Sequence, residues 1–358
     1  MAVDAPYPEL KKTHTMAHKG RPWTDYKPPP AAPVWSVIEG LGSYYILLAA
    51  IELDVFDTLE STGPVKVEVL SEKLEVSKPH LQSLLDSLVA LGFLDQFVNV
   101  YELNDTAKRY LTSNGPASMA NLISIAPGPH NNWLTLAETI KNGTPGNPID
   151  NDPASFYVPL VEGTFTTMLR TAIRSDLKIR YSSSPDLRVL DLGAGGAPWS
   201  IAFLSACPEA TSVVNDFAEV LEVAKRKTLE HKVFDRCEFR PGNFHDIEVE
   251  ANSYDLVVLG HVCRTEGEDG AANLIDRAFS ALKPGGRILV ADYFIDLERK
   301  FNPHGVLMGM TMMASTVNGF QISNEQVSLW LRESGFDSLR LIEPIGFQFV
   351  YVADKPIK

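Results

Sequence analysis

An acid and closely spaced glycines give this sequence its clearest chemical signal. The run 188–192 reads Arg-Val-Leu-Asp-Leu, an apolar stretch typical of a buried strand. Gly193 and Gly195 break it, and Pro198 stands where a helix takes its first turn. A strand, a glycine turn and a helix N-terminus present bare backbone N–H groups to a nucleotide. The dinucleotide pattern G-x-G-x-x-G fails at Pro198, so Asp191, just before the first glycine, becomes the informative residue.

The D-x-G-x-G pattern that begins at Asp191 resembles the S-adenosylmethionine (SAM) site of class I methyltransferases. The resemblance implies an acid about 20 residues further on, and Asp216 is placed to accept both ribose hydroxyls. It also implies a polar residue for adenine, which Asn243 supplies with an amide acceptor. We therefore predict that SAM is the cofactor and that it is held by Asp191, Gly193, Gly195, Asp216, Phe217, Asn243, Phe244 and His261.

Together these motifs resemble the small-molecule O-methyltransferase family over residues 33–358. The resemblance implies an α/β fold in which a Rossmann-like, seven-stranded SAM-binding sheet follows a mostly helical winged-helix dimerisation domain. It also implies a homodimer. We expect a flexible arm over 1–33, the dimerisation domain over 34–115, a helical connector with the substrate-pocket segment over 116–186, and the SAM-binding domain over 187–358.

The residues that would remove a proton from the acceptor depart from this family. Its members usually carry a histidine after the fourth strand as the base, supported by two carboxylates. The corresponding positions here hold Arg264, Asp292 and Gln321. An arginine stays protonated at biological pH and a glutamine carries no charge, so the usual base is missing.

A displaced histidine is one explanation. His261 is a candidate base, although it stands where the family usually places a residue that touches SAM. His130, just before Trp133, is a candidate base or hydrogen-bond donor, or it only lines the pocket. His245 and His304 are expected at the surface.

An acceptor without a proton to lose is the other explanation. A thioether sulfur or a carboxylate attacks as it stands, so the enzyme only aligns the reacting atoms and excludes water. Arg264 would then grip an acceptor carboxylate, unless it forms a structural salt bridge to Glu266, Glu268 or Asp292. This combination resembles the methylthiohydroxybutyrate S-methyltransferases of dimethylsulfoniopropionate synthesis. The alternative is O-methylation of a phenolic or polyketide metabolite, and a second alternative is a SAM-binding regulator without catalysis.

Aromatic and sulfur-containing side chains are available to line the acceptor pocket. Methionines at helical spacing are equally typical of plain core packing. The predicted acceptor contacts are His130, Trp133, Tyr157, Phe165, Met168, Arg264, Met308, Met312 and Gln321.

Composition excludes other classes. The 358 residues carry a net charge of −13, which opposes binding to nucleic acids and to anionic membranes. The helix expected over 77–91 has leucines at core spacing in place of cations that read a DNA groove. The apolar run 44–51 is too short to span a bilayer. Three cysteines without metal-ligand spacing and a start without a signal-peptide core predict a metal-free, cytoplasmic protein.

Hydrophobic periodicity places the remaining elements. It predicts helices over 35–59, 67–74 and 77–91, with an extended pair after them. The strands of the larger domain are expected over 188–192, 211–214, 237–240, 255–259, 287–291, 339–342 and 347–352.

Overall fold

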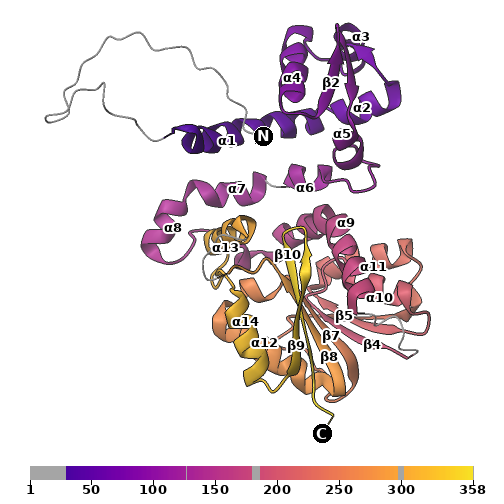
Figure 1. The fold of residues 1–358 in the computed structure, drawn as a ribbon, viewed down its shortest axis with the longest axis vertical. Coiled ribbons are helices and arrows are strands. Elements are labelled where there is room, and N and C mark those ends of the chain that lie inside the picture. Colours follow the sequence, from indigo (N-terminus) through magenta and orange to yellow (C-terminus); the bar gives the residue numbers. More distant parts are fainter. Residues whose placement is uncertain (1–29, 126, 180–185, 297–301, 358) are drawn as a thin grey trace, which may run out of the picture.

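The structure, a computed structural model, describes residues 30–125, 127–179, 186–296 and 302–357. Figure 1 shows a smaller, mostly helical N-terminal part and a larger part built on a sheet, with helices from residues 120–179 between them. Residues 1–29 of the predicted arm lie outside the described residues.

The N-terminal part has the winged-helix arrangement. Its elements are α1 (Ala32–Glu52), α2 (Val55–Thr62), β1 (Val65–Lys66), α3 (Val67–Lys73), α4 (Lys78–Ala90), β2 (Leu94–Phe97), β3 (Val100–Leu103) and α5 (Asp105–Tyr110). The strands pair antiparallel in the order β1-β3-β2, so the sheet contains one short strand more than the predicted pair. Leu81, Leu85 and Leu88 of α4 are buried, as their spacing indicates.

The prediction of one helix over 35–59 is wrong, because the chain forms α1 and α2 there. Asp54 lies between them with a φ angle of +54°. Aspartate tolerates this left-handed conformation better than most residues do. No glycine or proline marks the break, so the hydrophobic spacing continues through it unchanged.

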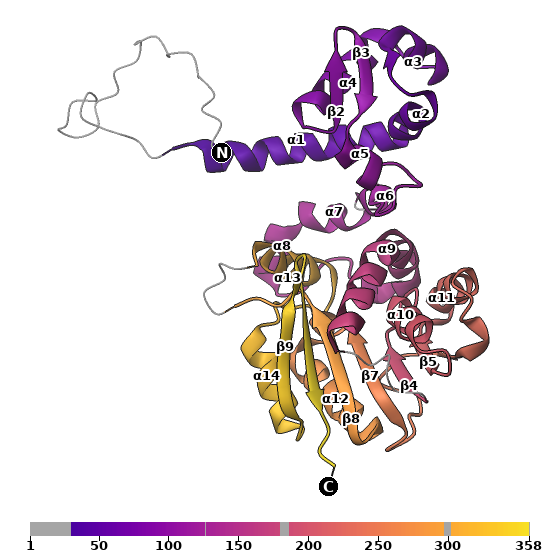
Figure 2. The same cartoon turned by 45° about the vertical axis from the view of Figure 1, so that its right-hand side comes forward.

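Four α-helices and a 3-10 turn connect the two parts. They are α6 (Ala120–Ile125), α7 (Pro127–Leu134), α8 (Leu136–Asn142), η2 (Ile149–Asn151) and α9 (Pro153–Ile179). In Figure 2, α6 and α7 lie between the winged helix and the sheet, while α9 packs along the sheet beside the helices that follow it.

The larger part contains a seven-stranded sheet in the order β6-β5-β4-β7-β8-β10-β9. Its strands are β4 (Arg188–Leu192), β5 (Thr211–Asp216), β6 (Cys237–Pro241), β7 (Tyr254–Gly260), β8 (Leu282–Asp292), β9 (Asp337–Ile345) and β10 (Gln348–Asp354). The first five run parallel, and β10 is antiparallel to both of its neighbours. All seven predicted strands are present, so the predicted fold class is confirmed.

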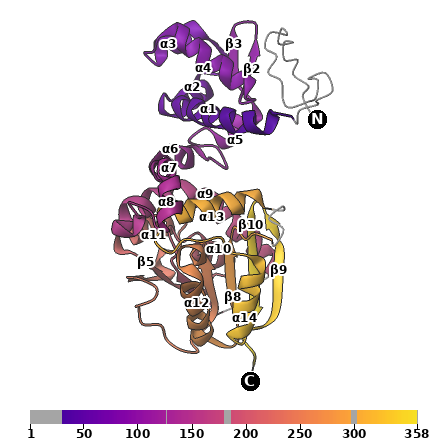
Figure 3. The same ribbon diagram turned by 90° about the vertical axis from the view of Figure 1, so that its left-hand side faces the viewer.

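Helices cover both faces of this sheet, as Figures 1 and 3 show. They are α10 (Pro198–Ala206), α11 (Ala218–Glu230), α12 (Gly267–Ala281) and α14 (Asn324–Glu333), with 3-10 turns η4 (Phe234–Arg236) and η5 (Cys263–Thr265). Helix α13 (Pro303–Ser315) lies beyond the end of the sheet and contacts α7, α8 and η5 (Figure 1). Alternate strand residues face opposite layers: Val258 packs with α10, whereas Val257 packs with α12 and α14. Strands that are buried on both faces have continuous apolar sequences, and this is why they could be predicted from the sequence.

Candidate active site

The glycine turn follows β4, the strand at which the order of strands in the sheet reverses. The chain leaves β4 toward β5 and β6 and then returns to place β7 on the other side of β4, which makes a topological switch point. Gly193 and Gly195 follow β4 with φ angles of +63° and +58°, which glycine adopts without a steric penalty. A Cβ atom on Gly193 would lie 2.5 Å from Val262 Cγ1. The turn therefore requires glycine for its shape and for its close packing.

Asp216 ends β5 directly beside this turn. Its Oδ2 accepts a hydrogen bond from the Gly195 N–H at 2.8 Å, and its Oδ1 accepts one from the Phe217 N–H at 2.8 Å. Burial raises the pKa of Asp216 to about 6, although the two N–H donors act to lower it. The spacing in the sequence thus brings the predicted ribose acid to the glycine turn.

Asp191 occupies a supporting position beneath the turn. Its carboxylate is fully buried and accepts hydrogen bonds from the Ser200 hydroxyl at 2.6 Å and the Ser200 N–H at 3.2 Å. Burial raises the pKa of Asp191 to about 6. The acid that signals the motif therefore anchors the start of α10, and its bonded oxygen faces the protein.

Phe244 and Asn243 lie in the loop after β6. The Phe244 ring packs toward the glycine turn, where a Cβ atom on Gly193 would lie 3.4 Å from it. Asn243 is exposed, and its Oδ1 accepts a hydrogen bond from the His245 N–H at 2.8 Å. Asp191, Asp216 and Phe244 therefore lie around the turn that Gly193 and Gly195 form. Asn243 is more exposed than these residues.

These residues fit an adenosine-containing cofactor. Gly193 and Gly195 leave the backbone bare, and the Asp216 carboxylate carries lone pairs beyond the two that the backbone N–H groups use. The half-buried Phe244 adds an apolar ring suited to a base.

Arg264 is buried in an ion pair. It lies in η5, and its Nη1 donates to Asp292 Oδ1 at 2.6 Å. The Asp292 side chain is 0% exposed and that of Arg264 is 12% exposed. Burial acts to lower the pKa of Arg264, but Asp292 and Tyr293 raise it overall. The position where relatives are expected to carry a base therefore holds a fixed cation, and the salt bridge to Asp292 that the sequence left open is present.

His261 follows β7 in a strained conformation. Its φ angle is +68°, and its N–H donates to the Ala291 carbonyl at 2.7 Å. The side chain of Gln348 lies within hydrogen-bonding reach of its imidazole. Burial lowers the pKa of His261 to about 4, against the opposing effect of Asp292. The imidazole is neutral at pH 7, and this pKa makes it a weak base.

Tyr157 and Met168 of α9 reach the same region. The Tyr157 ring stacks on Phe217 with 6.5 Å between centroids, and its pKa is raised, chiefly by burial. Met168 Sδ lies 3.7 Å from Gln348 Nε2. Both predicted side chains thus lie near residues of the candidate site.

Phe165, predicted to line the acceptor pocket, is instead a core residue. It is buried, its ring packs behind Gly196, and its other neighbours are His231 and Lys227 of the α11 region. Helical periodicity directs Phe165 toward α11, because α9 packs against α10 and α11 along this face.

Helix α13 supplies the predicted methionines. Met308 is half-buried and Met312 is buried. Gln321 donates from Nε2 to the Val306 carbonyl of α13 at 3.2 Å, so it supports this helix. Trp133 is half-buried on α7, which contacts α13. The predicted His130 side chain lies outside the described residues.

Sequence reasoning missed Tyr293, His304 and Gln348. Gln348 is 3% exposed, and its side chain lies within hydrogen-bonding reach of His261 and Tyr293. His304, expected at the surface, packs between the rings of Tyr293 and Phe347. Only Tyr293 had a signal in the sequence, because it directly follows Asp292. His304 and Gln348 reach the site only through the tertiary fold.

Buried polar atoms without partners gather around Arg264. Among the described residues they include Arg264 Nε and Asp292 Oδ2. Unsatisfied buried groups of this kind are costly and are usually kept for function. The arrangement therefore indicates a site for a polar ligand. No group of three or more His, Cys, Asp or Glu suited to a metal occurs in the described ranges.

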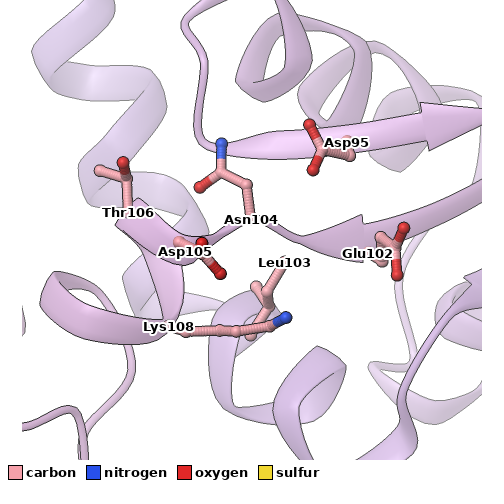
Figure 4. A pocket seen from close by; sticks show the side chains of 7 residues that line it. All are labelled: Asp95, Glu102, Leu103, Asn104, Asp105, Thr106 and Lys108. Atoms are coloured by element: carbon pink, nitrogen blue, oxygen red, sulfur yellow. The ribbon is translucent and has the colours of Figure 1, made fainter.

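A separate hollow of about 360 Å³ lies on the winged helix. Figure 4 shows it between β2, β3 and α5, where Asp95, Glu102 and Lys108 lie around it. It carries mixed charges and no group placed for catalysis, so the chemistry belongs to the larger part.

Comparison with known proteins follows the same two-part division. Residues 35–113 match the O-methyltransferase dimerisation domain family, and residues 173–337 match the O-methyltransferase domain family. The chain is 24% identical to 3-hydroxy-5-methyl-1-naphthoate 3-O-methyltransferase of Streptomyces sahachiroi, over 85% of this chain and 88% of that protein. It is 26% identical to human acetylserotonin O-methyltransferase, over 81% of this chain and 88% of that protein.

Solved structures share the fold. Human N-acetylserotonin methyltransferase in complex with SAM matches with a TM-score of 0.79 at 22% identity, covering 93% of this chain and 99% of that chain. An O-methyltransferase-like protein from Nostoc punctiforme matches with a TM-score of 0.83 at 24% identity, covering 92% of this chain and 100% of that one.

Fold, glycine turn and matched domains define a SAM-dependent methyltransferase. Within that class, the chain combines an O-methyltransferase dimerisation domain with an O-methyltransferase domain. SAM is therefore its cofactor, as the motifs predict.

Proposed function

We propose that this methyltransferase acts on a small metabolite whose reacting atom has no proton to remove, such as the thioether of a small carboxylate. The observation that carries this proposal is the buried Arg264–Asp292 pair at the position where the base is expected. A guanidinium keeps its proton, and the imidazole of His261, which senses the charge of Arg264, has a pKa of only about 4. Neither group is suited to deprotonate a hydroxyl at neutral pH.

The residues around the glycine turn are the proposed cofactor site. When bound, SAM supplies an electrophilic methyl group. Asp216 would accept the ribose hydroxyls, Phe244 would cover the adenine, and the bare backbone at Gly193 and Gly195 would allow close approach. Asp191 would act indirectly by holding α10 against the turn.

Arg264 would orient the acceptor. Only one of its five N–H donors is used by Asp292, and its Nε has no partner among the described residues. The remaining donors suit a carboxylate, which guanidinium binds through parallel hydrogen bonds. Methylthiohydroxybutyrate, a thioether with a carboxylate, fits this requirement. Its sulfur lone pair would form the new carbon–sulfur bond while the bond from the methyl carbon to the sulfonium sulfur of SAM breaks. Demethylated SAM would be the leaving group, and no proton would be released.

A second candidate is O-methylation of a phenolic or polyketide hydroxyl. The names of the relatives favour it, since one acts on a hydroxynaphthoate and another on a tetracenomycin polyketide. Such a reaction needs a base. His261 is one candidate, and the half-buried His304 is another, so the two proposals differ in their dependence on an imidazole.

The acceptor class is tested by comparing methylthiohydroxybutyrate with a hydroxynaphthoate from about one pH unit below the His261 pKa up to weakly alkaline pH, by following demethylated SAM. We expect turnover of the thioether without a limb that titrates at the His261 pKa of about 4. Turnover of the hydroxynaphthoate alone, with such a limb that disappears in His261→Asn, would support the second candidate instead.

Substitution of Arg264 tests the anchor. Arg264→Met is expected to raise the acceptor KM by about 10- to 100-fold, because a charge-assisted hydrogen bond contributes about 1.5–3 kcal/mol. The Kd for SAM is expected to stay unchanged. Arg340→Met, which removes an arginine with a 53% exposed side chain on β9, is the matched control. An unchanged acceptor KM in Arg264→Met would contradict the proposal.

We also propose that the protein is a homodimer, because α1 exposes an apolar face. Val37, Ile38 and Leu41 are 76%, 56% and 62% exposed, so α1 presents an apolar face to solvent. By length and composition this helix also passes as a membrane span, with 11% of its apolar window buried. Because residues 35–113 match a dimerisation domain, we assign the face to a second copy of the chain in the cytoplasm.

A further inference from the structure

Four rings form a column beside the proposed acceptor site. The centroids of His261 and Tyr293 lie 5.1 Å apart, those of Tyr293 and His304 lie 4.8 Å apart, and those of His304 and Phe347 lie 4.8 Å apart. The rings come from the end of β7, the end of β8, the start of α13 and the β9–β10 turn. We call them the ring column. It joins four elements that are distant in sequence.

The ring column contacts the Arg264 guanidinium. Arg264 Cζ lies 5.3 Å from the centroid of the Tyr293 ring, within the range of a cation–π interaction. Asp292 Oδ1 accepts from Arg264 Nη1 at 2.6 Å and from the Tyr293 N–H at 2.9 Å. The guanidinium is therefore held by a carboxylate and by the face of a ring.

The start of α13 is fixed to the same place. Asn302 is 3% exposed, and its Oδ1 caps the helix by accepting from the Gly305 N–H at 3.1 Å. Its Nδ2 donates to the Phe294 carbonyl at 2.9 Å and to the Phe347 carbonyl at 3.1 Å. His304 lies in the first turn of α13, the helix that carries Met308. The ring column thus links Arg264 to this helix.

His304 serves this arrangement as a flat, uncharged ring. Burial and the nearby charge of Arg264 both lower its pKa. The rings of His304 and Phe347 are stacked, with an interplanar angle of 22°. A phenyl ring can make the same contacts, so the role needs shape and apolar faces rather than a proton.

We propose that Tyr293 and His304 are positioning residues that hold the Arg264 guanidinium in the orientation that binds the acceptor and couple it to the seating of α13. This inference rests on the proposed function, because it takes Arg264 to be the acceptor anchor. Neither residue transfers a proton in this role.

Steady-state kinetics of His304→Ala and His304→Phe test the proposal, with methylthiohydroxybutyrate as the probe. We expect His304→Ala to raise the acceptor KM about tenfold, the upper end of what one aromatic pair contributes, because the Tyr293 ring on Arg264 loses its packing partner; kcat should stay within twofold and the Kd for SAM unchanged. His304→Phe and Tyr293→Phe, which keep the rings, should stay within about twofold of the wild type. His80→Ala on the exposed face of α4 is the control.

A double-mutant cycle identifies the route of the effect. If His304 acts through Arg264, the variant with both Arg264→Met and His304→Ala will have the same KM as Arg264→Met alone. Additive losses, or a His304→Phe as impaired as His304→Ala, would overturn the proposal. If the wild type methylates only the hydroxynaphthoate, the proposed acceptor class fails, and the same cycle run on that substrate still tests the ring column. Thermal melting establishes that each variant is folded.

Discussion

His261 keeps a neutral imidazole beside charged neighbours, and this has a measurable consequence for stability. Burial lowers its pKa from 6.5 to about 4. Between these values the unfolded chain binds a proton that the folded protein does not, so the free energy of unfolding falls as the pH falls. The maximum slope from this residue is about 1.4 kcal/mol per pH unit.

We therefore expect His261→Asn to lose less stability than the wild type when the pH is lowered from 6.5 to 4, the interval set by the His261 pKa. Denaturant unfolding at steps of pH measures the difference. His80→Asn, at an exposed position, should keep the slope of the wild type. A His261→Asn variant with an unchanged slope would show that the imidazole is not buried in its neutral form.

Among the elements, the glycine turn makes the sharpest steric demand. Gly193 has a φ angle of +63°, and a Cβ atom added to it would lie 2.5 Å from Val262 Cγ1. Gly143, at a helix end, has a φ angle of +77° with nothing within 4 Å of such an atom. The two glycines share the same kind of conformation and differ in packing.

We predict that Gly143→Ala costs about 1 kcal/mol of stability, the strain of a left-handed alanine. Gly193→Ala is expected to cost about 2 kcal/mol or more, because the methyl group also forces Val262 to move. It should also weaken SAM binding, while Gly143→Ala should not. Calorimetric titration with SAM and denaturant unfolding test both; equal effects of the two variants would contradict the assignment.

A structural feature could be predicted from the sequence where neighbouring residues determine it, and not where distant segments must first fold together. The buried strands and the glycine turn are local patterns, so β4 and the positions of Gly193 and Asp216 followed from the sequence. The break at Asp54 has no local marker. His304 and Gln348 join the site only because α13 and β10 fold against β8, and no spacing along the chain encodes such ring contacts.

Ala197 adopts a conformation that its residue type does not favour. It stands at the N-cap of α10 with a φ angle of +59°. An alanine in this left-handed conformation costs about 1 kcal/mol. The chain therefore carries strain directly after the glycine turn.

At the scale of the whole molecule, the exposed face of α1 makes a prediction about assembly. A glutamate at Ile38 would place a charge in the middle of the apolar face and desolvate it on association. We expect Ile38→Glu to shift the protein from dimer to monomer in sedimentation equilibrium. Phe97→Glu, at an apolar side chain that is 82% exposed on the wing, is expected to stay dimeric. Dissociation by both variants, or by neither, would contradict this interface.

The position of β10 in the sheet determines when the sheet can be completed during synthesis. This strand lies between β8 and β9, yet the ribosome makes it after all the other strands of the sheet. Until it pairs, β8 is an unprotected edge, and exposed edges invite pairing with other chains. Gln348 arrives with β10, so a nascent chain can shape the glycine turn after β4 before β10 pairs with β8 and brings Gln348 beside Met168.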